Sequence, residues 1–145
     1  MLDKATRDRL VASALEAREA AYAPYSDFKV GAALLTASGA IYQGCNVENA
    51  AFGAGICAER TAAVKAVAAG DRVFVAVAVA GFADKTAAAE RGLAYPCGIC
   101  RQFLHEFAAP DMTVLVARAA EDVATTTLSA LLPEAFGPDA LLNDT

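Results

Sequence analysis

Apolar and polar positions at the start of the chain follow the period of a helix. Residues 3–22 gather apolar side chains such as Leu10 and Leu15 on one stripe and charged side chains on the other, a pattern typical of a helix packed on a core. Asp3 is expected to cap this helix at its start. Pro24 is expected to end it, because proline disfavours helical geometry at the residue before it.

Further along, the pattern changes to that of strands. Residues 28–37, "FKVGAALLTA", predict a strand, the Ser-Gly pair at 38–39 predicts a hairpin turn, and residues 40–47, "AIYQGCNV", predict the returning strand. Residues 73–82, "VFVAVAVAGF", form an almost unbroken apolar run, which is typical of a strand buried on both faces. Residues 112–119, "MTVLVARA", predict another strand.

Helical segments separate the later strands. Residues 57–70, "CAERTAAVKAVAAG", predict a helix that Gly70 closes. Residues 98–107 predict a second helix, and residues 128–133, "LSALLP", predict a short one. Strands separated by helices indicate a sheet that helices cover on both faces. We therefore expect a single α/β domain over residues 1–145.

Composition narrows the class of partner. The net charge is −5 and the chain has no basic run, whereas a nucleic-acid binder carries a cationic surface that neutralises phosphates. No stretch approaches the roughly 20 apolar residues that span a bilayer, and the start lacks the apolar core of a signal peptide. We expect a cytoplasmic protein with reduced cysteines that binds small molecules. Its alanine-rich, thin core favours self-association.

The first candidate for chemistry is the pair Cys97 and Cys100. Two residues separate these cysteines, and Gly98 allows the backbone to turn so that both sulfurs face one point. Such a pair before a helix has two interpretations, a redox dithiol or half of a zinc site. A zinc site needs a third protein ligand.

Three residues are candidates for this third ligand. Cys57 is favoured because it begins a predicted helix, where the helix dipole and free N–H groups stabilise a thiolate. Cys45 lies within a predicted strand and is interpreted as a small buried apolar residue. His105 lies more than one turn beyond Cys100 and is interpreted as partly exposed and structural.

Glu59 indicates what the metal would be for. Three thiolates with an open fourth position are typical of a catalytic zinc, whereas four closed ligands are typical of a structural one. A carboxylate two residues after Cys57 can reach a metal-bound water and transfer its proton to a leaving group. By itself Glu59 would be a solvated helix carboxylate, but the cysteines beside it favour the catalytic interpretation.

These elements together resemble the zinc nucleoside and nucleobase deaminases, whose signature is a ligand-x-Glu followed later by Pro-Cys-x-x-Cys. Here the two parts are "CAE" at 57–59 and "PCGIC" at 96–100. With cysteine as first ligand, the chain is similar to the small homotetrameric cytidine deaminases. The similarity extends over nearly the whole chain, through "YAPYSDFKVGAAL", "GCNVENA", "GICAERTA", "PCGICRQFLHEF" and "LLPEAFGPDAL". It implies a three-layer α/β/α fold with a central mixed sheet of about five strands.

The resemblance also implies substrate contacts. Asn46 and Glu48 would hydrogen-bond the ribose hydroxyls, although by themselves they are a turn amide and a surface carboxylate. Phe28 would pack against the pyrimidine and the sugar, although its period indicates a core strand residue. Ala58 would offer its backbone N–H to the base carbonyl.

Three further residues are assigned by the same resemblance. Arg60 would hydrogen-bond the cysteine sulfurs, and Phe136 would reach into a neighbouring subunit's site within a homotetramer. Without the resemblance, Arg60 would be a surface cation and Phe136 an apolar residue that anchors the C-terminal tail. Phe52 stands where many relatives have tyrosine, so a polar contact on the ribose side is in doubt.

The implied reaction is zinc-dependent hydrolytic deamination of cytidine and deoxycytidine to uridine, deoxyuridine and ammonia, as in pyrimidine salvage. Three alternatives remain open. In the first, the substrate would be another cytosine nucleoside, such as the antibiotic blasticidin S. In the second, the zinc would be structural and Glu59 incidental. In the third, Cys97 and Cys100 would form a redox dithiol.

Overall fold

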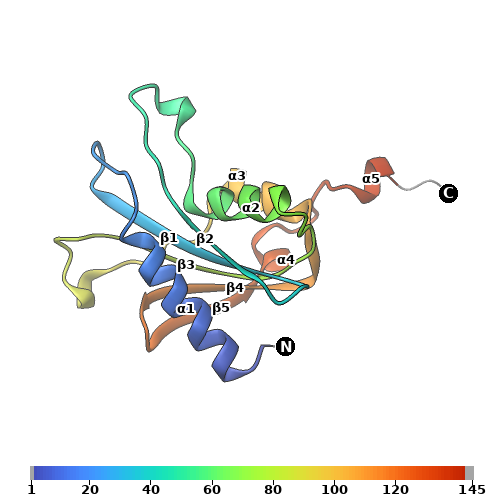
Figure 1. The fold of residues 1–145 in the computed structure, drawn as a ribbon, viewed down its shortest axis with the longest axis horizontal. Coiled ribbons are helices and arrows are strands. Elements are labelled where there is room, and N and C mark those ends of the chain that lie inside the picture. The colour runs from blue at the N-terminus through green and yellow to red at the C-terminus, as the bar shows by residue number, and fades with distance from the viewer. Residues whose placement is uncertain (1, 143–145) are drawn as a thin grey trace.

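A mixed sheet of five strands runs through the molecule in the order β2–β1–β3–β4–β5 (Figure 1). The chain is described from a computed structural model, in which residues 2–142 are placed. Neighbouring strands are antiparallel except for β3 and β4, which are parallel. The strands are β1 (Phe28–Thr36), β2 (Ile41–Cys45), β3 (Phe74–Ala83), β4 (Ala108–Ala119) and β5 (Asp122–Thr127).

Helices cover both faces of this sheet. On one face α1 (Lys4–Arg18) packs through Leu10, Val11 and Ala14. On the other lie α2 (Ala58–Ala68), α3 (Gly98–His105) and α4 (Leu128–Leu131), each with residues in a second core cluster. The expected three-layer α/β/α fold with a five-stranded mixed sheet is therefore confirmed.

Local sequence explains several boundaries. The Asp3 carboxylate accepts the Thr6 N–H at 2.8 Å and caps α1 as expected, and the helix ends at Arg18, earlier than its apolar stripe suggested. Gly39 in the hairpin and Gly70 after α2 have φ angles of 89° and 92°, a left-handed conformation that glycine adopts without strain. The hairpin turn at Gly39 and the helix stop at Gly70 were both expected from the sequence.

Two glycines let the helices approach the sheet closely. A Cβ atom on Gly31 would lie 2.1 Å from the Ala14 carbonyl oxygen, so α1 rests directly on β1. A Cβ atom on Gly44 would lie 2.4 Å from the Ala58 carbonyl oxygen, so the start of α2 rests directly on β2. The second contact matters for function because Ala58 lies between two of the expected site residues.

Strand β5 has no counterpart among the segments predicted from the pattern of apolar positions. Its sequence, "DVATTT", has few apolar residues, and it becomes a strand by pairing antiparallel with β4, from Thr113↔Thr127 to Ala119↔Asp122. Strand β4 also begins at Ala108, four positions before the apolar run. Tertiary pairing extends the sheet where the local pattern is weak.

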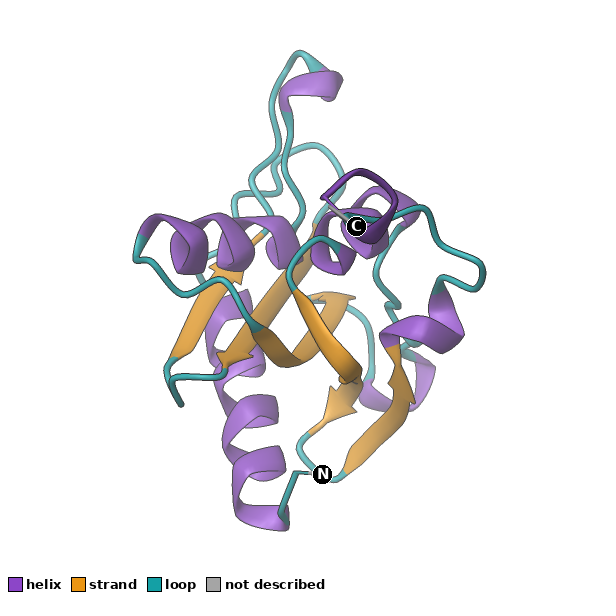
Figure 2. Cartoon of the chain, turned by 90° about the vertical axis from the view of Figure 1, so that its right-hand side faces the viewer, coloured by secondary structure: helices purple, strands orange, loops and turns teal. Residues whose placement is uncertain are grey.

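Some segments project from the layered body. The connection between β2 and α2 carries the short 3-10 helix η1 (Phe52–Ala54) and rises well beyond the sheet, as Figure 2 shows at the top of the view. A second 3-10 helix, η2 (Ala88–Glu90), lies between β3 and α3. The last helix, α5 (Asp139–Leu142), lies apart from the body in Figure 1. Within residues 2–142, no helix combines the length and apolar character needed to cross a bilayer.

Candidate metal centre and its cavity

Three cysteines meet where α2 and α3 begin. The sulfur atoms of Cys57, Cys97 and Cys100 all lie within 4.8 Å of one another. Cys57 occupies the N-cap of α2 and Cys97 the N-cap of α3, so the positive ends of two helices point at the cluster. Neither Cys45 nor His105 belongs to the cluster, and both are partly buried elsewhere.

The spacing of the sulfurs is that of a metal site. Thiolates about 2.3 Å from a tetrahedral zinc are about 3.8 Å apart, and the Cys57 and Cys97 sulfurs are 3.8 Å apart. That separation is far too long for a disulfide, and the four cysteines of the described chain are all free. An all-sulfur ligand set favours zinc over magnesium or calcium.

Two cysteines of the cluster, Cys57 and Cys100, have pKa values shifted in opposite directions. The pKa of Cys57 falls to about 5, chiefly because its sulfur accepts a hydrogen bond from the Cys100 thiol, with help from Arg60. The pKa of Cys100 is raised, because that thiol donates to Cys57 and is buried. A guanidinium N–H of Arg60 points at the Cys57 sulfur from 3.8 Å. The site therefore stabilises negative charge on sulfur before any metal binds.

Glu59 lies in the first turn of α2, is only 4% exposed and lines the same cavity as Cys57 and Cys97. Burial raises the pKa of its carboxyl to about 7, opposed in part by the nearby Arg60 charge. A carboxyl that titrates near neutrality can both accept and donate a proton at physiological pH. The alternative interpretation of Glu59, as a solvated helix carboxylate, does not describe this buried side chain.

The cavity in front of the cluster has a volume of about 720 Å³. Most of the residues expected to contact substrate line it, together with Phe52. Ser26, Ala94 and Tyr95 also line it, and they were not singled out from the sequence. The expected residues that line the cavity are Phe28, Asn46, Glu48, Cys57, Ala58, Glu59, Arg60 and Cys97.

Phe136 is placed differently. The residue is 64% exposed and is not part of the cavity lining of its own chain. Gln102 of α3 donates to the Phe136 carbonyl at 2.9 Å, which ties the C-terminal segment to the helix that carries Cys100. His105 lies against the next residue, since a Cβ atom on Gly137 would be 2.4 Å from its Nε2.

Asn46 uses its side chain to hold the start of β1. Its Oδ1 accepts the Val30 N–H at 2.8 Å, and its Nδ2 donates to the Phe28 carbonyl at 2.8 Å. The amide therefore sits at the cavity edge with half of its hydrogen-bonding capacity already used. This arrangement fixes the backbone on either side of Lys29, at the start of β1.

Glu48 is held by the turn before β1. Its carboxylate accepts the Tyr25 N–H at 2.9 Å, the Ser26 N–H at 3.2 Å and the Ser26 hydroxyl. These donors, the Ser26 hydroxyl first, lower the pKa of Glu48. A carboxylate accepts about four hydrogen bonds, so capacity remains for a ligand. The sequence signal for this turn is the "PYS" segment at 24–26, of which only Pro24 enters the prediction from sequence, as the end of the first helix.

Comparison with known proteins gives a consistent result. The family model described as "Cytidine and deoxycytidylate deaminase zinc-binding region" matches residues 4–116. The cytidine deaminase of Sporosarcina psychrophila is 46% identical over 134 residues, covering 92% of this chain and 93% of the relative. The cytidine deaminase of Halalkalibacterium halodurans is 43% identical, covering 90% and 93%.

Solved structures agree with these relatives. The crystal structure of cytidine deaminase from Burkholderia pseudomallei has a TM-score of 0.79 at 45% identity, covering 93% of this chain and 100% of that one. The enzyme from Mycobacterium tuberculosis has a TM-score of 0.72 at 34% identity, covering 90% and 96%.

Proposed function

Because the chain belongs to the cytidine and deoxycytidylate deaminase zinc-binding family, we propose that it deaminates cytidine and deoxycytidine hydrolytically, within pyrimidine salvage. The products are uridine or deoxyuridine and ammonia. The observation that carries this proposal is the buried carboxyl of Glu59 facing a three-cysteine metal cluster inside one cavity. A structural zinc would not need a buried carboxyl of this kind beside it.

Zinc is the metal of this site, and Cys57, Cys97 and Cys100 are the residues that hold it. When bound, zinc acts as a Lewis acid and generates a nucleophile from water at neutral pH. Arg60 offsets the negative charge of the three thiolates, because its guanidinium points at the Cys57 sulfur.

Glu59 moves the protons of the reaction. It takes one proton from the attacking water and delivers it to N3 of the cytosine ring, which makes C4 electrophilic. The water oxygen bonds to C4 as a hydroxyl. Glu59 then takes the proton of this hydroxyl and passes it to the amino group, which leaves as ammonia when the C4–N bond breaks and the C4 carbonyl forms. A carboxyl with a pKa of about 7 is suited to both transfers.

The remaining lining residues bind and orient the nucleoside. Phe28 lies on the cavity wall and packs against the pyrimidine and sugar, while Asn46 and Glu48 hold the ribose hydroxyls with their unused hydrogen-bonding capacity. Ala58 opens α2, where backbone N–H groups have no partner within the helix, and it donates to the base carbonyl.

The active species is a cytoplasmic homotetramer, with sites shared between subunits. Exposed apolar side chains support this part of the proposal: Phe52 is 80% exposed and Ile99 is 65% exposed, both at the cavity. Phe136 projects from the C-terminal segment and reaches the cavity of a neighbour. We also propose that the chain forms a single domain, because both core clusters pack on the same five-stranded sheet.

One experiment tests the proposed function. The purified protein is analysed for zinc and incubated with cytidine while the ultraviolet absorbance of the base is followed. We expect one zinc per chain, an absorbance change from cytidine to uridine, and release of ammonia. The matched variant is Glu59→Gln, which should retain zinc and lose at least ~100-fold in turnover. Zinc without turnover in the parent protein would favour a structural site instead.

A further inference from the structure

Ala94 and Tyr95, at the end of the long segment between β3 and α3, form part of the cavity wall. We infer that two neighbouring residues of β3, Gly81 and Phe82, hold this wall in place from the two faces of the sheet. Gly81 and Arg91 are then positioning residues for the pocket. That the ligand of the pocket is a nucleoside rests on the proposed function, whereas the packing of the wall does not.

Side chains alternate across a strand, so Gly81 and Phe82 face opposite sides of the sheet. Phe82 belongs to the core cluster under α1. Gly81 pairs with Val30 of β1, whose side chain lines the cavity. The segment that reaches Ala94 can therefore be contacted from both faces where it passes the end of β3.

On the cavity face, Ala94 rests on Gly81. A Cβ atom on Gly81 would lie 2.8 Å from the Ala94 Cβ and 3.1 Å from both Phe28 Cε1 and Val30 Cγ2. A Cβ atom cannot rotate away, so a methyl group here requires the backbone at Ala94 to move. The missing side chain of Gly81 thus sets how far the Ala94 wall stands from Phe28.

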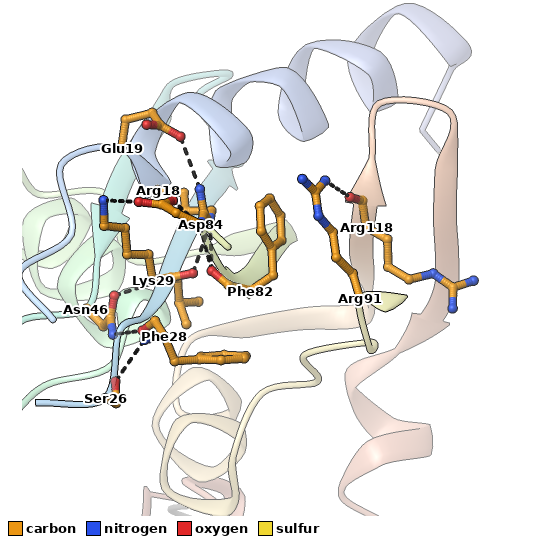
Figure 3. A network of polar contacts seen from close by, with 11 residues as sticks. Arg18, Glu19, Ser26, Phe28, Lys29, Asn46, Phe82, Asp84, Arg91 and Arg118 are labelled. Carbon is orange, nitrogen blue, oxygen red and sulfur yellow. Dashed lines mark hydrogen bonds and ion pairs between the residues drawn. The ribbon is translucent and has the colours of Figure 1, made fainter. Parts of the chain in front are cut away.

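On the other face, Arg91 stacks on Phe82. The guanidinium carbons of Arg18 and Arg91 each lie 3.7 Å from the centre of the Phe82 ring, on its two sides, as Figure 3 shows. Arg91 also donates from Nη1 to the Arg118 carbonyl at 2.9 Å. Arg18 is itself fixed, because it is 3% exposed and donates to the Phe82 carbonyl and to Asp84.

The rest of the segment has little else to hold it. Within the described chain, the Arg91 bond to Arg118 is the side-chain hydrogen bond that joins residues 85–95 to the body. Its backbone hydrogen bonds are local turns such as Glu90 to Ala87. The two contacts with β3, together with the packing of Leu93 on the core, therefore position the wall.

The first test is a pair of compensating substitutions. Gly81→Ala should raise the KM for cytidine roughly 10-fold or more, because displacing a positioned group by about 1 Å is costly, while zinc content and kcat change little. Gly81→Ala with Ala94→Gly removes the shortest overlap and leaves the 3.1 Å contacts with Phe28 and Val30, so it should return KM most of the way to the parent value. Gly92→Ala is the control, since no atom lies within 4 Å of a Cβ atom there.

The second test addresses Arg91. Arg91→Ala should raise KM roughly 5-fold, and Arg91→Lys should recover part of the loss because it keeps a cation over the ring. Arg118→Ala is the control, because the carbonyl that Arg91 uses remains. An unchanged KM in both Gly81→Ala and Arg91→Ala overturns the inference, as does a folded, zinc-loaded double variant that fails to recover.

Amide hydrogen exchange separates this inference from the proposed function. Exchange in residues 91–95 should be faster in Arg91→Ala and Gly81→Ala than in the parent, whatever the substrate. If the parent protein does not act on cytidine, the proposed function is contradicted, but hydrogen exchange still tests whether Gly81 and Phe82 position the wall. Unchanged exchange in both variants contradicts this positioning even if deamination is normal. The test therefore remains decisive if KM cannot be measured.

Discussion

Substituting Gly44 by alanine should damage the metal site through the backbone, without touching a ligand. A Cβ atom on Gly44 would lie 2.4 Å from both the Ala58 carbonyl oxygen and the Ala62 nitrogen. Ordinary contact begins near 3.4 Å, so the first turn of α2 must retreat by about 1 Å, and overpacking of this kind costs about 1–3 kcal/mol. For a 145-residue domain this lowers the melting temperature by roughly 3–10 °C.

The consequence for function follows from what that turn carries. Cys57 caps α2 and Glu59 lies in its first turn, so both move relative to Cys97 and Cys100. A misplacement of about 1 Å in a catalytic arrangement costs on the order of 100-fold in rate. We therefore expect Gly44→Ala to fold with a lower melting temperature and to lose zinc affinity and roughly 100-fold in kcat/KM.

Gly31→Ala is the matched control, because it creates the same kind of overlap on the other face of the sheet. Its Cβ atom would lie 2.1 Å from the Ala14 carbonyl oxygen and 2.3 Å from the Arg18 nitrogen, so α1 retreats and the cysteines stay in place. Because Arg18 also stacks on Phe82, the two variants are compared by thermal melting, zinc content and kcat, not by KM. Equal losses of zinc and kcat would refute the reasoning, as would parent-like zinc content and kcat in Gly44→Ala.

Four shorter predictions complete the set. Cys45→Ala should keep zinc and activity, whereas Cys57→Ala should lose the metal; zinc loss in the former would overturn the ligand assignment. Phe136→Ala should raise KM in a protein that sediments as a tetramer, and a fully active monomer would contradict shared sites. Arg60→Gln should keep most of the zinc, lower turnover and move the acidic limb of the pH–rate profile upward; a parent-like profile would make Arg60 a surface charge. The pKa of Asp71 is lowered, chiefly because its carboxylate accepts a hydrogen bond from the Tyr42 hydroxyl. The contribution of ionised Asp71 to folding stability is therefore present above the pKa of the unfolded state and is lost as pH falls through the pKa of the folded state. The melting temperatures of the parent and Asp71→Asn should therefore converge in acid, and a constant gap would contradict this.

The sequence by itself determined the elements whose side chains repeat with a clear period. The stripe of α1, the buried run of β3 and the stop at Gly70 all depend on neighbours along the chain. Strand β3 and Gly70 lie where they were expected, and α1 begins at its Asp3 cap but ends at Arg18, before the stop expected from Pro24. The same holds for Cys57 and Cys97 as helix starts, because the residues around each are local signals. Their assignment to one site came from the need for a third zinc ligand together with a family resemblance, since no local rule links residues 40 positions apart.

The tertiary structure decided what depends on packing between distant segments. Strand β5 exists because β4 offers it a hydrogen-bonding edge, not because its own sequence is apolar. The raised pKa of Glu59 comes from burial between layers. Ala94, in the loop before α3, lies at the cavity wall against Gly81 of β3, which has no side chain to displace it. Each of these properties is a distance or a burial between residues far apart in sequence, which periodicity along the chain does not encode.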